Sequence, residues 1–428
     1  MKIYNNPPKA TWQQLTQRPQ LELEFLDSAV RNLLNRVKKS GDSALRELTL
    51  QFDKVSVQEF LVTTEETEEA VKGIPTELQK AIRMAASNIE KFHAAQKRES
   101  MQVETIPGVS CWRKAVAIDK VGIYIPGGSA PLFSTVLMLG IPAKLAGCRE
   151  VVLCTPPDAS GNVNAAILFA AQLVGVTKIF KVGGAQAIAA MAYGTQSVPK
   201  VYKIFGPGNQ YVTKAKQLVI EDGLAIDMPA GPSEVLVMAD DSSNPSFVAA
   251  DLLSQAEHGE DSQVILVVNK ESLIAPIQKE IERQISVLPR KSIAERALVN
   301  SRVILLENQQ DAIGFVNEYA PEHLIINTKN TEEIASAIIN AGSVFLGNYS
   351  PEAIGDYASG TNHTLPTNGY AKAFAGVSLE SFMKYITYQR LTEQGIKTLG
   401  PVVEQMAEAE QLMGHKMAVK VRLESLKK

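Results

Sequence analysis

The chain has 428 residues, enough for about two to four domains at roughly 100 to 200 residues each. Hydrophobic residues make up 45% and charged residues 21%, with 28 glycines and 21 prolines, so the composition excludes a disordered or collagen-like protein. Lysine and arginine number 43 against 46 aspartate and glutamate, a net charge of -3. Because no basic surplus is available to neutralise a phosphate backbone, nucleic acid is not an expected partner.

The cysteines and the first residues indicate a cytoplasmic protein. Cys111, Cys148 and Cys154 form an odd set without CxxC spacing, which suits a reducing compartment. The opening stretch MKIYNNPPKATWQQ lacks the apolar region of a signal peptide. Residues 121–143 carry no charge, but prolines and a Gly-Gly pair interrupt them, so we expect a buried strand, loop and helix and no membrane span.

The first long pattern in the chain is helical. From about residue 26 to 98, apolar residues recur at alternating steps of four and three, which places one stripe on a helix running into FHAAQK. That stripe comprises Leu78, Ile82, Ala85, Ile89 and Phe92. We interpret His93, which follows it directly, as a polar residue at the end of the helix.

After Cys111 the pattern changes to short β-branched strands that alternate with helices. The pairs are VGIYIPGG with PLFSTVLMLGIPAKLAG, EVVLCTPP with AAILFAAQLVG, KIFKVGG with AQAIAAMAYG, and VYKIFGPG with NQYVTKAKQLV. A second series runs through the strands SEVLVMAD, QVILVVN, RVILLEN, HLIINT and SVFLGN, with helices between them. Repeated strand and helix predict right-handed βαβ units, so we expect two doubly wound, Rossmann-like α/β lobes, residues 122–232 and 233–375.

The two ends of the chain are expected to lie outside these lobes. Residues 1–24 and the charge-rich segment 376–428, which has a helical pattern, carry too little apolar surface for a core of their own. We therefore expect both to be extensions that pack on another lobe or on another subunit.

The histidines point to a site in the second half of the chain, where four of the five are found. Gln255 and His258 are three positions apart at the end of a predicted helix, so both side chains lie on one face and could meet one ion or ligand. Helix ends without a ligand show the same spacing, so both interpretations stay open.

Glu322 and His323 are adjacent, directly before an apolar strand. Consecutive residues at the start of a strand project in different directions, so these two are not expected to pair with each other. They could instead flank a substrate as acid and base, because histidine titrates near neutral pH and burial raises the pKa of a glutamate towards it. A Glu-His surface corner beside Pro321 is the alternative.

Two further segments supply titratable groups. The loop GDYASGTNHTLPT contains Asp356 and His363 and follows the last predicted strand, where ligand sites of open α/β sheets tend to lie. The tail contributes Glu410 and His415, which are five positions apart and so do not share a helix face unless the helix breaks near Gly414.

Four of these side chains would make a metal site. Gln255, His258, Asp356 and His415 together offer one amide oxygen, two imidazole nitrogens and one carboxylate oxygen. This set suits Zn²⁺, with Mn²⁺ or Co²⁺ as alternatives, and leaves the ion able to accept ligands from a substrate.

The glycine-rich turns VGGAQ and FGPGNQ each follow a strand and open a helix, where backbone N–H groups can face an anion. Neither is GxGxxG, so tight turns without a ligand are the alternative. The acidic residue that usually binds the ribose of a dinucleotide cannot be assigned from the sequence.

Several long motifs resemble those of the histidinol dehydrogenase family, in the same order and at similar spacing from about residue 25 onward. They are YIPGGSAPLFSTVLML, VGGAQAIAA, KIFGPGN, DMPAGPSEVLV, DLLSQAEHG, PEHL, GDYASGTNH and the closing AEAExxxxHK at residues 407–416. The resemblance implies one lobe of residues 25–121 and 233–375 with the zinc and catalytic residues, and an NAD-binding lobe of residues 122–232. It also implies helical extensions, residues 1–24 and 376–428, that are exchanged across a homodimer.

In function, the resemblance implies oxidation of L-histidinol to L-histidine through L-histidinal, with two NAD⁺ and one Zn²⁺ per subunit, in histidine biosynthesis. The implied zinc ligands are Gln255, His258, Asp356 and His415, and the implied catalytic pair is Glu322 and His323. Further implied substrate contacts are Ser233, His363 and Glu410, besides His323 and the metal ligands themselves. The implied NAD contacts are Tyr124, Gln186 and Asn209. Glu410 and His415 would complete the site of the neighbouring subunit.

The resemblance also suggests separate catalytic roles for His323 and Glu322. His323 would take the hydroxyl proton while hydride leaves for NAD⁺, and Glu322 would activate the water that adds to the aldehyde. A cysteine nucleophile, Cys148 or Cys154, is the less favoured alternative because these residues flank a core strand. Three alternative functions stay open: a dehydrogenase for a different primary alcohol, a zinc hydrolase that needs no nucleotide, and a two-lobed binding protein without catalysis. The presence of His363 and Glu410 favours histidinol.

Overall fold

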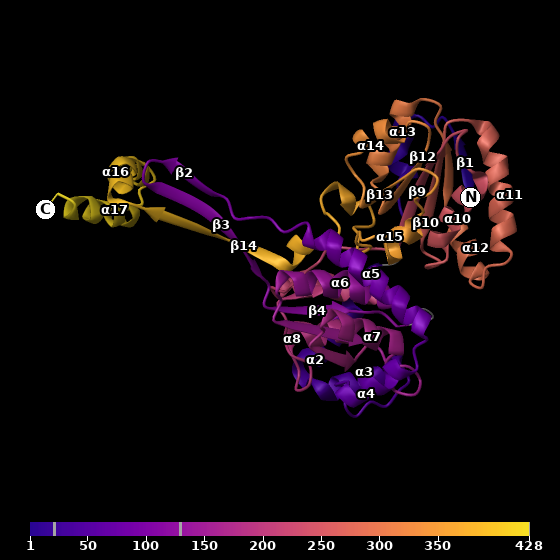
Figure 1. Ribbon diagram of the computed structural model, residues 1–428, viewed down its shortest axis with the longest axis horizontal. Helices are drawn as coiled ribbons and strands as arrows, with labels where there is room; N and C mark the ends of the chain where they lie inside the picture. The colour runs from indigo at the N-terminus through magenta and orange to yellow at the C-terminus, as the bar shows by residue number, and fades with distance from the viewer. Residues whose placement is uncertain (20–22, 128–130, 428) are drawn as a thin grey trace. The chain divides into compact units, whose positions relative to one another are not determined.

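The computed structural model describes residues 1–19, 23–127 and 131–427. Residues 20–22 of the N-terminal extension and residues 128–130 of the YIPGGSAPLF motif lie outside the described residues. The chain divides into two compact units (Figure 1). Unit 1 consists of Met1–Ala95 and Asp119–Phe382, and unit 2 of Gln96–Ile118 and Met383–Lys428. In the part of the chain that is described, no helix is long and apolar enough to cross a membrane.

Unit 1 contains a five-stranded parallel sheet in the order β6-β5-β4-β7-β8, which we call the five-stranded lobe together with its helices. Its strands are β4 (Lys120–Tyr124), β5 (Glu150–Thr155), β6 (Lys178–Lys181), β7 (Lys203–Phe205) and β8 (Ala225–Ile226). The helices α6 (Phe133–Ala146), α7 (Ala165–Val174), α8 (Gly184–Tyr193) and α9 (Gln210–Glu221) follow the first four strands. All four predicted strand-helix pairs are therefore confirmed, and the strand order reverses beside β4.

The N-terminal helices also belong to this lobe. They are α2 (Leu23–Ser40), α3 (Asp42–Phe52), α4 (Thr64–Lys72) and α5 (Thr76–Ala94). Leu34 and Leu45 share one buried core with Val152 and Ile188, while α5 packs on α6 and α4 on α7. The expected grouping of residues 25–121 with residues 233–375 is therefore wrong. The physical reason is that a parallel sheet must be covered on both faces, and α2 to α5 complete that cover here.

The second sheet of unit 1 has six parallel strands in the order β1-β11-β10-β9-β12-β13 and, with its helices, forms the six-stranded lobe. Its strands are β1 (Lys2–Asn5), β9 (Glu234–Ala239), β10 (Gln263–Val268), β11 (Arg302–Leu305), β12 (His323–Asn327) and β13 (Ser343–Leu346). The N-terminal extension, which we expected to be helical, thus begins with an edge strand that pairs with β11.

Helices cover both faces of the six-stranded sheet (Figure 1). One face carries α10 (Pro245–Ala256), α11 (Ile274–Ile285) and α12 (Lys291–Val299), and the other α1 (Trp12–Leu15), α13 (Gln309–Tyr319) and α14 (Thr331–Ser336). A short helix α15 (Glu352–Tyr357) follows β13. Because each crossover helix returns the chain to the amino ends of the strands, helix ends and strand starts meet at that edge.

Unit 2 is built on a three-stranded antiparallel sheet in the order β14-β3-β2. Its elements are β2 (Gln102–Ile106), β3 (Val109–Ala117), β14 (Met383–Leu391), α16 (Glu393–Ala409) and α17 (Met413–Ser425). The expectation of a wholly helical tail is therefore wrong, since β14 pairs with β3 along its whole length and Tyr388 stacks on Trp112. Short 3-10 helices complete the structure at η1 (Lys9–Thr11), η2 (Glu271–Leu273), η3 (Tyr370–Lys372) and η4 (Leu379–Phe382).

Candidate active site

The predicted site residues of the six-stranded lobe gather at the amino ends of its strands. Glu322 directly precedes β12, His323 is the first residue of β12, and Ser233 directly precedes β9. Gln255 lies in the last turn of α10, which has brought the chain back from the carboxyl end of β9. The position of the Asp356 loop had suggested a site at the carboxyl ends of the strands. The structure places these residues at the opposite edge of the sheet.

The main chain of Glu234, the first residue of β9, holds three of these side chains. Its N–H donates to Oε2 of Glu322 at 2.9 Å. Its carbonyl oxygen accepts from Nε2 of Gln255 at 3.2 Å and lies 3.1 Å from Nδ1 of His323. A proton on Nδ1 therefore has an acceptor in this carbonyl, which leaves Nε2 of His323 as the nitrogen able to accept a proton.

Glu322 and His323 are both buried, with 6% and 3% of their surface exposed, so the interpretation as a surface corner is wrong. Their side chains also converge, since Oε2 of Glu322 lies 3.6 Å from Nδ1 of His323. This differs from the expectation that they would point apart. The reason is that Glu322 lies outside the strand, so the alternation of a pleated strand does not apply to the pair.

The pKa values of both members of this pair are raised, for different physical reasons. Burial raises the pKa of Glu322 to about 8, opposed in part by His323. For His323, burial works to lower the pKa, but the carboxylates of Glu352, Glu322 and Asp356 outweigh it and hold the pKa well above its usual value. A proton is thus strongly held at His323 as long as all three carboxylates face it.

Acceptor atoms suited to a cation lie beside this pair. Oδ1 of Asp356, in α15, is 3.3 Å from Nε2 of His323. Oδ1 of Asp356 and Oε1 of Gln255 are both buried without a hydrogen-bond partner among the described residues. Gln255 lies beside Nδ1 of His323 and Asp356 beside Nε2, and two buried oxygens without a well-formed hydrogen bond next to one imidazole are suited to a cation, so the residues present fit a divalent ion.

His258 is the third predicted ligand that the fold brings to this place. It follows α10, and its charge interactions are with Asp356, His323 and His363. The side chain of His258 is exposed at the surface, but the protein around its ring removes enough water to lower its pKa, which favours the neutral imidazole that can coordinate a metal.

Glu352 is a site residue that the sequence analysis missed. Ligand atoms of His323, Glu352 and Asp356 all lie within 4.8 Å of one another, and burial raises the pKa of Glu352 to about 8. The sequence does contain a signal for Glu352: it lies four positions before Asp356, so the two carboxylates share one face of a helix.

The two predicted residues of the tail lie in unit 2. Glu410 follows the end of α16, and His415 lies in the first turn of α17. The helix breaks between them at residues 410–412, close to Gly414, and Gln411 there has a φ of 61°. Both side chains are exposed. Their part in the site therefore remains a prediction.

His363 links the two lobes of unit 1. Its Nδ1 lies 2.8 Å from the carbonyl oxygen of Asp356, and its Nε2 lies 3.0 Å from Oγ1 of Thr135 in the first turn of α6. A proton on Nδ1 and the hydroxyl of Thr135 satisfy both contacts. The start of α6, which follows β4, is therefore held beside the candidate active site.

His93 takes part in the same junction. It is fully buried in the last turn of α5, with Nδ1 2.9 Å from the carbonyl oxygen of Ile89 and Nε2 3.4 Å from the amide of Asn362. The position at the helix end is as predicted, and the contacts are those of a structural histidine.

The three predicted NAD contacts come together at the carboxyl ends of the five-stranded sheet. The hydroxyl of Tyr124, at the end of β4, accepts from the N–H of Gly184, while Oδ1 of Asn209 caps α9 by accepting from Tyr211 and Val212. Gln186 is 1% exposed, and its Nε2 has no hydrogen-bond partner among the described residues. This is the edge at which open parallel sheets bind ligands.

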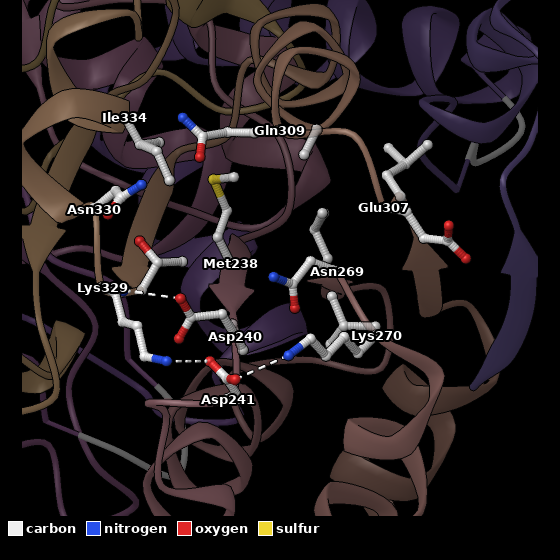
Figure 2. A pocket seen from close by; sticks show the side chains of 16 residues that line it. Met238, Asp240, Asp241, Asn269, Lys270, Glu307, Gln309, Lys329, Asn330 and Ile334 are labelled. Atoms are coloured by element: carbon white, nitrogen blue, oxygen red, sulfur yellow. Dashed lines mark hydrogen bonds and ion pairs between the residues drawn. The ribbon is translucent and has the colours of Figure 1, made fainter.

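A cavity of about 340 Å³ lies at the corresponding edge of the six-stranded sheet (Figure 2). Figure 2 shows the ammonium groups of Lys270 and Lys329 paired with the carboxylate of Asp241, each at 2.9 Å. Asp240 and Glu307 also line the cavity. Because its two cations are neutralised and its carboxylates outnumber them, this cavity offers no surplus positive charge to a pyrophosphate.

Asp53 is a second carboxylate that the sequence analysis did not single out. It follows α3, its Oδ2 is buried without a partner among the described residues, and burial raises its pKa to about 6. A carboxyl whose pKa is higher in the folded protein stabilises the fold at low pH, and this contribution is lost as the pH rises through the folded value.

We therefore expect Asp53→Asn to raise the melting temperature, with a gain that grows between about pH 4 and 6 and stays constant above that range. Thermal unfolding of both proteins at several pH values measures it. A lower melting temperature of the variant at pH 8 would contradict the assigned burial of this carboxyl.

Known proteins resemble this chain along nearly its whole length. The profile of the histidinol dehydrogenase family matches residues 16–423. The chain is 60% identical to a histidinol dehydrogenase of Bacteroides fragilis (strain YCH46) over 428 residues, 100% of both chains, and 52% identical to one of Haemophilus influenzae (strain 86-028NP) over 99% of both. A crystal structure of histidinol dehydrogenase from Elizabethkingia anophelis superposes with a TM-score of 0.97 at 57% identity, covering 100% of this chain and 99% of that one.

The family profile spans both lobes of unit 1 and reaches into the tail that carries Glu410 and His415. The matches cover 100% of one of these relatives and 99% of the other. This chain therefore belongs to the histidinol dehydrogenase family of NAD-dependent oxidoreductases.

Proposed function

We propose that the protein oxidises L-histidinol to L-histidine through L-histidinal, using two NAD⁺ in succession, at the end of histidine biosynthesis. The observation that carries this proposal is the buried pair Glu322 and His323, oriented by the main chain of Glu234 beside unpartnered acceptor atoms of Gln255 and Asp356. A two-step oxidation of an amino alcohol requires a base, here His323, a second acid-base group, here Glu322, and a cation site beside them.

The proposed metal is one Zn²⁺ per subunit, held by Gln255, His258 and Asp356 together with His415 of the partner subunit. Bound there, zinc supplies a Lewis-acid anchor for the amino and imidazole nitrogens of the substrate. Ser233, His363 and Glu410 of the partner subunit are proposed to complete the substrate pocket. His363 would release Thr135 when it turns to the substrate, because both of its ring nitrogens are engaged in the structure.

In the first oxidation, Nε2 of His323 takes the hydroxyl proton while the carbon-bound hydrogen leaves as hydride for the nicotinamide. The bond from Nδ1 to the Glu234 carbonyl keeps the ring in the required tautomer. Asp356 contributes to the raised pKa of His323. When this carboxylate serves as a metal ligand its charge is shared, so the pKa of His323 falls towards the range of a general base.

In the second oxidation, Glu322 takes a proton from the water that adds to the aldehyde, and His323 returns the proton it took in the first oxidation to the aldehyde oxygen, which gives a hydrated aldehyde and a neutral His323. His323 then removes the proton from a hydroxyl of the hydrated aldehyde, and a second hydride leaves for a second NAD⁺. The position of Oε2 of Glu322, 3.6 Å from Nδ1 of His323, supports two adjacent acid-base groups acting on one carbon.

We propose a single NAD⁺ site per chain, on the five-stranded lobe, with Tyr124, Gln186 and Asn209 as contacts. The charge balance of the cavity on the six-stranded lobe argues against a second site there. The reversal of strand order in both sheets supports describing each lobe as doubly wound.

The proposed assembly is a homodimer in the cytoplasm, in which residues 376–428 of one chain complete the site of the other. The exposure of Glu410 and His415 supports this role of the tail, because both side chains are accessible to a neighbouring subunit. The cysteines Cys111, Cys148 and Cys154 are unpaired, which suits a reducing compartment.

The test is to incubate the purified protein with L-histidinol and NAD⁺ and to count the NADH formed per histidine. We expect a ratio of two and loss of activity when the metal is fully removed. A ratio of one, or activity that survives metal removal, would overturn the proposal. Turnover without NAD⁺ would indicate a hydrolase, and faster oxidation of another primary alcohol would change the substrate.

Arg18 is expected to influence catalysis from outside the site. Its Nε and Nη2 donate to the two carboxylate oxygens of Glu234 at 3.0 and 2.7 Å, and its guanidinium lies 3.7 Å from the ring centre of Tyr319. Arg18→Met would leave the buried Glu234 carboxylate without its cation and with only the N–H of Asn368 as a donor among the described residues, so we expect the main chain that orients Glu322 and His323 to shift. We expect kcat to fall about 10- to 100-fold, the effect typical of groups that support a metal or catalytic site.

The double variant Arg18→Met/Glu234→Gln separates an effect on the orientation of the catalytic pair from an effect on the stability of the fold. Steady-state kinetics measure the first effect and thermal unfolding measures the second. Removing both charges should restore the melting temperature, whereas kcat should remain low because the two-pronged contact is absent. Recovery of both quantities would show that the pair has only a structural role.

A further inference from the structure

In the five-stranded lobe, the acidic residue at the place where dinucleotide-binding sheets usually bind the ribose is engaged in its own turn. In such sheets the acid that binds the adenosine ribose lies near the end of the second strand. The second strand here is β5, and Asp158 is the acid that follows it. Its Oδ1 accepts from the N–H groups of Ser160 and Asn162, at 2.8 and 2.9 Å, so this carboxylate serves its own turn.

Asp53 brings a carboxylate to that place from another part of the chain. A Cβ atom added to Gly183 would lie 3.2 Å from Oδ1 of Asp53 and would collide with the ring of Pro156, which directly follows β5. Asp53 therefore packs against the turn that opens α8, next to the end of β5. The chain after Asp53 is fixed along β6, since Val62 donates to the carbonyl of Ile179 and Lys181 donates to the carbonyl of Phe60.

Two polar atoms at this turn have no hydrogen-bond partner in the part of the chain that the structure describes. Oδ2 of Asp53 is a buried acceptor, and Nε2 of Gln186, in the first turn of α8, is a buried donor. The neighbouring titratable group is Tyr124, whose hydroxyl is occupied by the N–H of Gly184. An acceptor and a donor side by side match a pair of adjacent hydroxyl groups, each of which both donates and accepts.

The orientation of a bound dinucleotide follows from the junction between the lobes. The contact of Thr135 with His363 holds the first turn of α6 beside the catalytic pair, and because α6 is the helix that follows β4, a nicotinamide that reaches this pair would lie over β4. The adenosine end then extends over β5 and β6, where Asp53 lies.

We propose that Asp53 binds the hydroxyl groups of the adenosine ribose and sets a preference for NAD⁺ over NADP⁺. This inference rests on the proposed NAD⁺ site of the five-stranded lobe. A carboxylate at the 2′-hydroxyl accepts its hydrogen bond but repels the 2′-phosphate of NADP⁺, so one residue accounts for both binding and exclusion.

The test compares Asp53→Asn with the matched variant Asp158→Asn in the full-length, zinc-loaded enzyme. For Asp53→Asn we expect the KM for NAD⁺ to rise about 10- to 100-fold with little change in kcat, since a hydrogen bond to a charged group is lost. The ratio of kcat/KM for NADP⁺ to that for NAD⁺ should rise by at least the same factor. Asp158→Asn should leave both values as they are, because an asparagine oxygen can still accept in that turn.

Direct binding of NAD⁺ and NADP⁺, measured by calorimetry without histidinol, separates this inference from the proposed reaction. If the unmodified protein binds NAD⁺ but does not oxidise histidinol, the proposed reaction fails, and the affinities of Asp53→Asn still decide the role of Asp53. If Asp53→Asn binds NAD⁺ as tightly as the unmodified protein, or discriminates against NADP⁺ as strongly, the inference is wrong. Absence of NAD⁺ binding to the unmodified protein would overturn both.

Discussion

Replacing His323 by asparagine is expected to lower kcat by about 10²- to 10⁴-fold in both oxidation steps while zinc stays bound. An asparagine amide can still donate to the carbonyl of Glu234, as Nδ1 of His323 does at 3.1 Å, so the surroundings are preserved. What disappears is the proton acceptor at the position of Nε2. Single-turnover rates with histidinol and with histidinal, together with zinc content by atomic absorption, measure the effect.

The zinc content of this variant distinguishes two metal sites. His323, Glu352 and Asp356 could form a set of their own, because their ligand atoms lie within 4.8 Å of one another. If His323→Asn loses zinc, His323 is a ligand and its assignment as the base is wrong. If a variant with zinc bound fails only in the first oxidation, a different group serves the second.

The elements that local patterns define could be predicted from the sequence. Every β4 to α9 unit and each strand from β9 to β13 appears where alternating strand and helix signals placed it. Those signals depend on neighbours within one turn or one strand, so a single sequence contains them. The candidate residues around Gln255 and His323 could also be found, because long motifs carry them.

Contacts between distant segments could not be predicted in the same way. β1 pairs with β11 across some 300 residues, and β14 pairs with β3. The apolar patterns of β1 and β14 are too short or too weak to indicate from the sequence which strand each one pairs with. Arg18 lies in an irregular segment after α1 and Asp53 in the turn after α3, and only the fold brings these two charged residues to Glu234 and to Gly183. Main-chain groups, such as the N–H and carbonyl of Glu234, have no sequence signature at all.

Asp356 should be the residue on which metal binding depends most. It supplies the one carboxylate of the proposed ligand set, and its Oδ1 is buried without a hydrogen-bond partner among the described residues. Asp356→Asn keeps an oxygen at this position but removes the charge that offsets the ion. We expect zinc affinity and activity to fall by more than the roughly 10- to 100-fold typical of residues that only support a ligand. Equilibrium dialysis against a competing chelator measures the affinity.

Glu352→Gln is the matched control, because it neutralises a second buried carboxyl on the same face of α15. Both carboxylates raise the pKa of His323, so both variants lower it, and a change in the pH profile of kcat is expected from each. Only Asp356→Asn should release zinc. If Glu352→Gln releases zinc equally while a His258 variant retains it, the ion is held by His323, Glu352 and Asp356. In that case the amide oxygen of Gln255 would need another partner, and the proton acceptor in the two oxidations would have to be sought elsewhere.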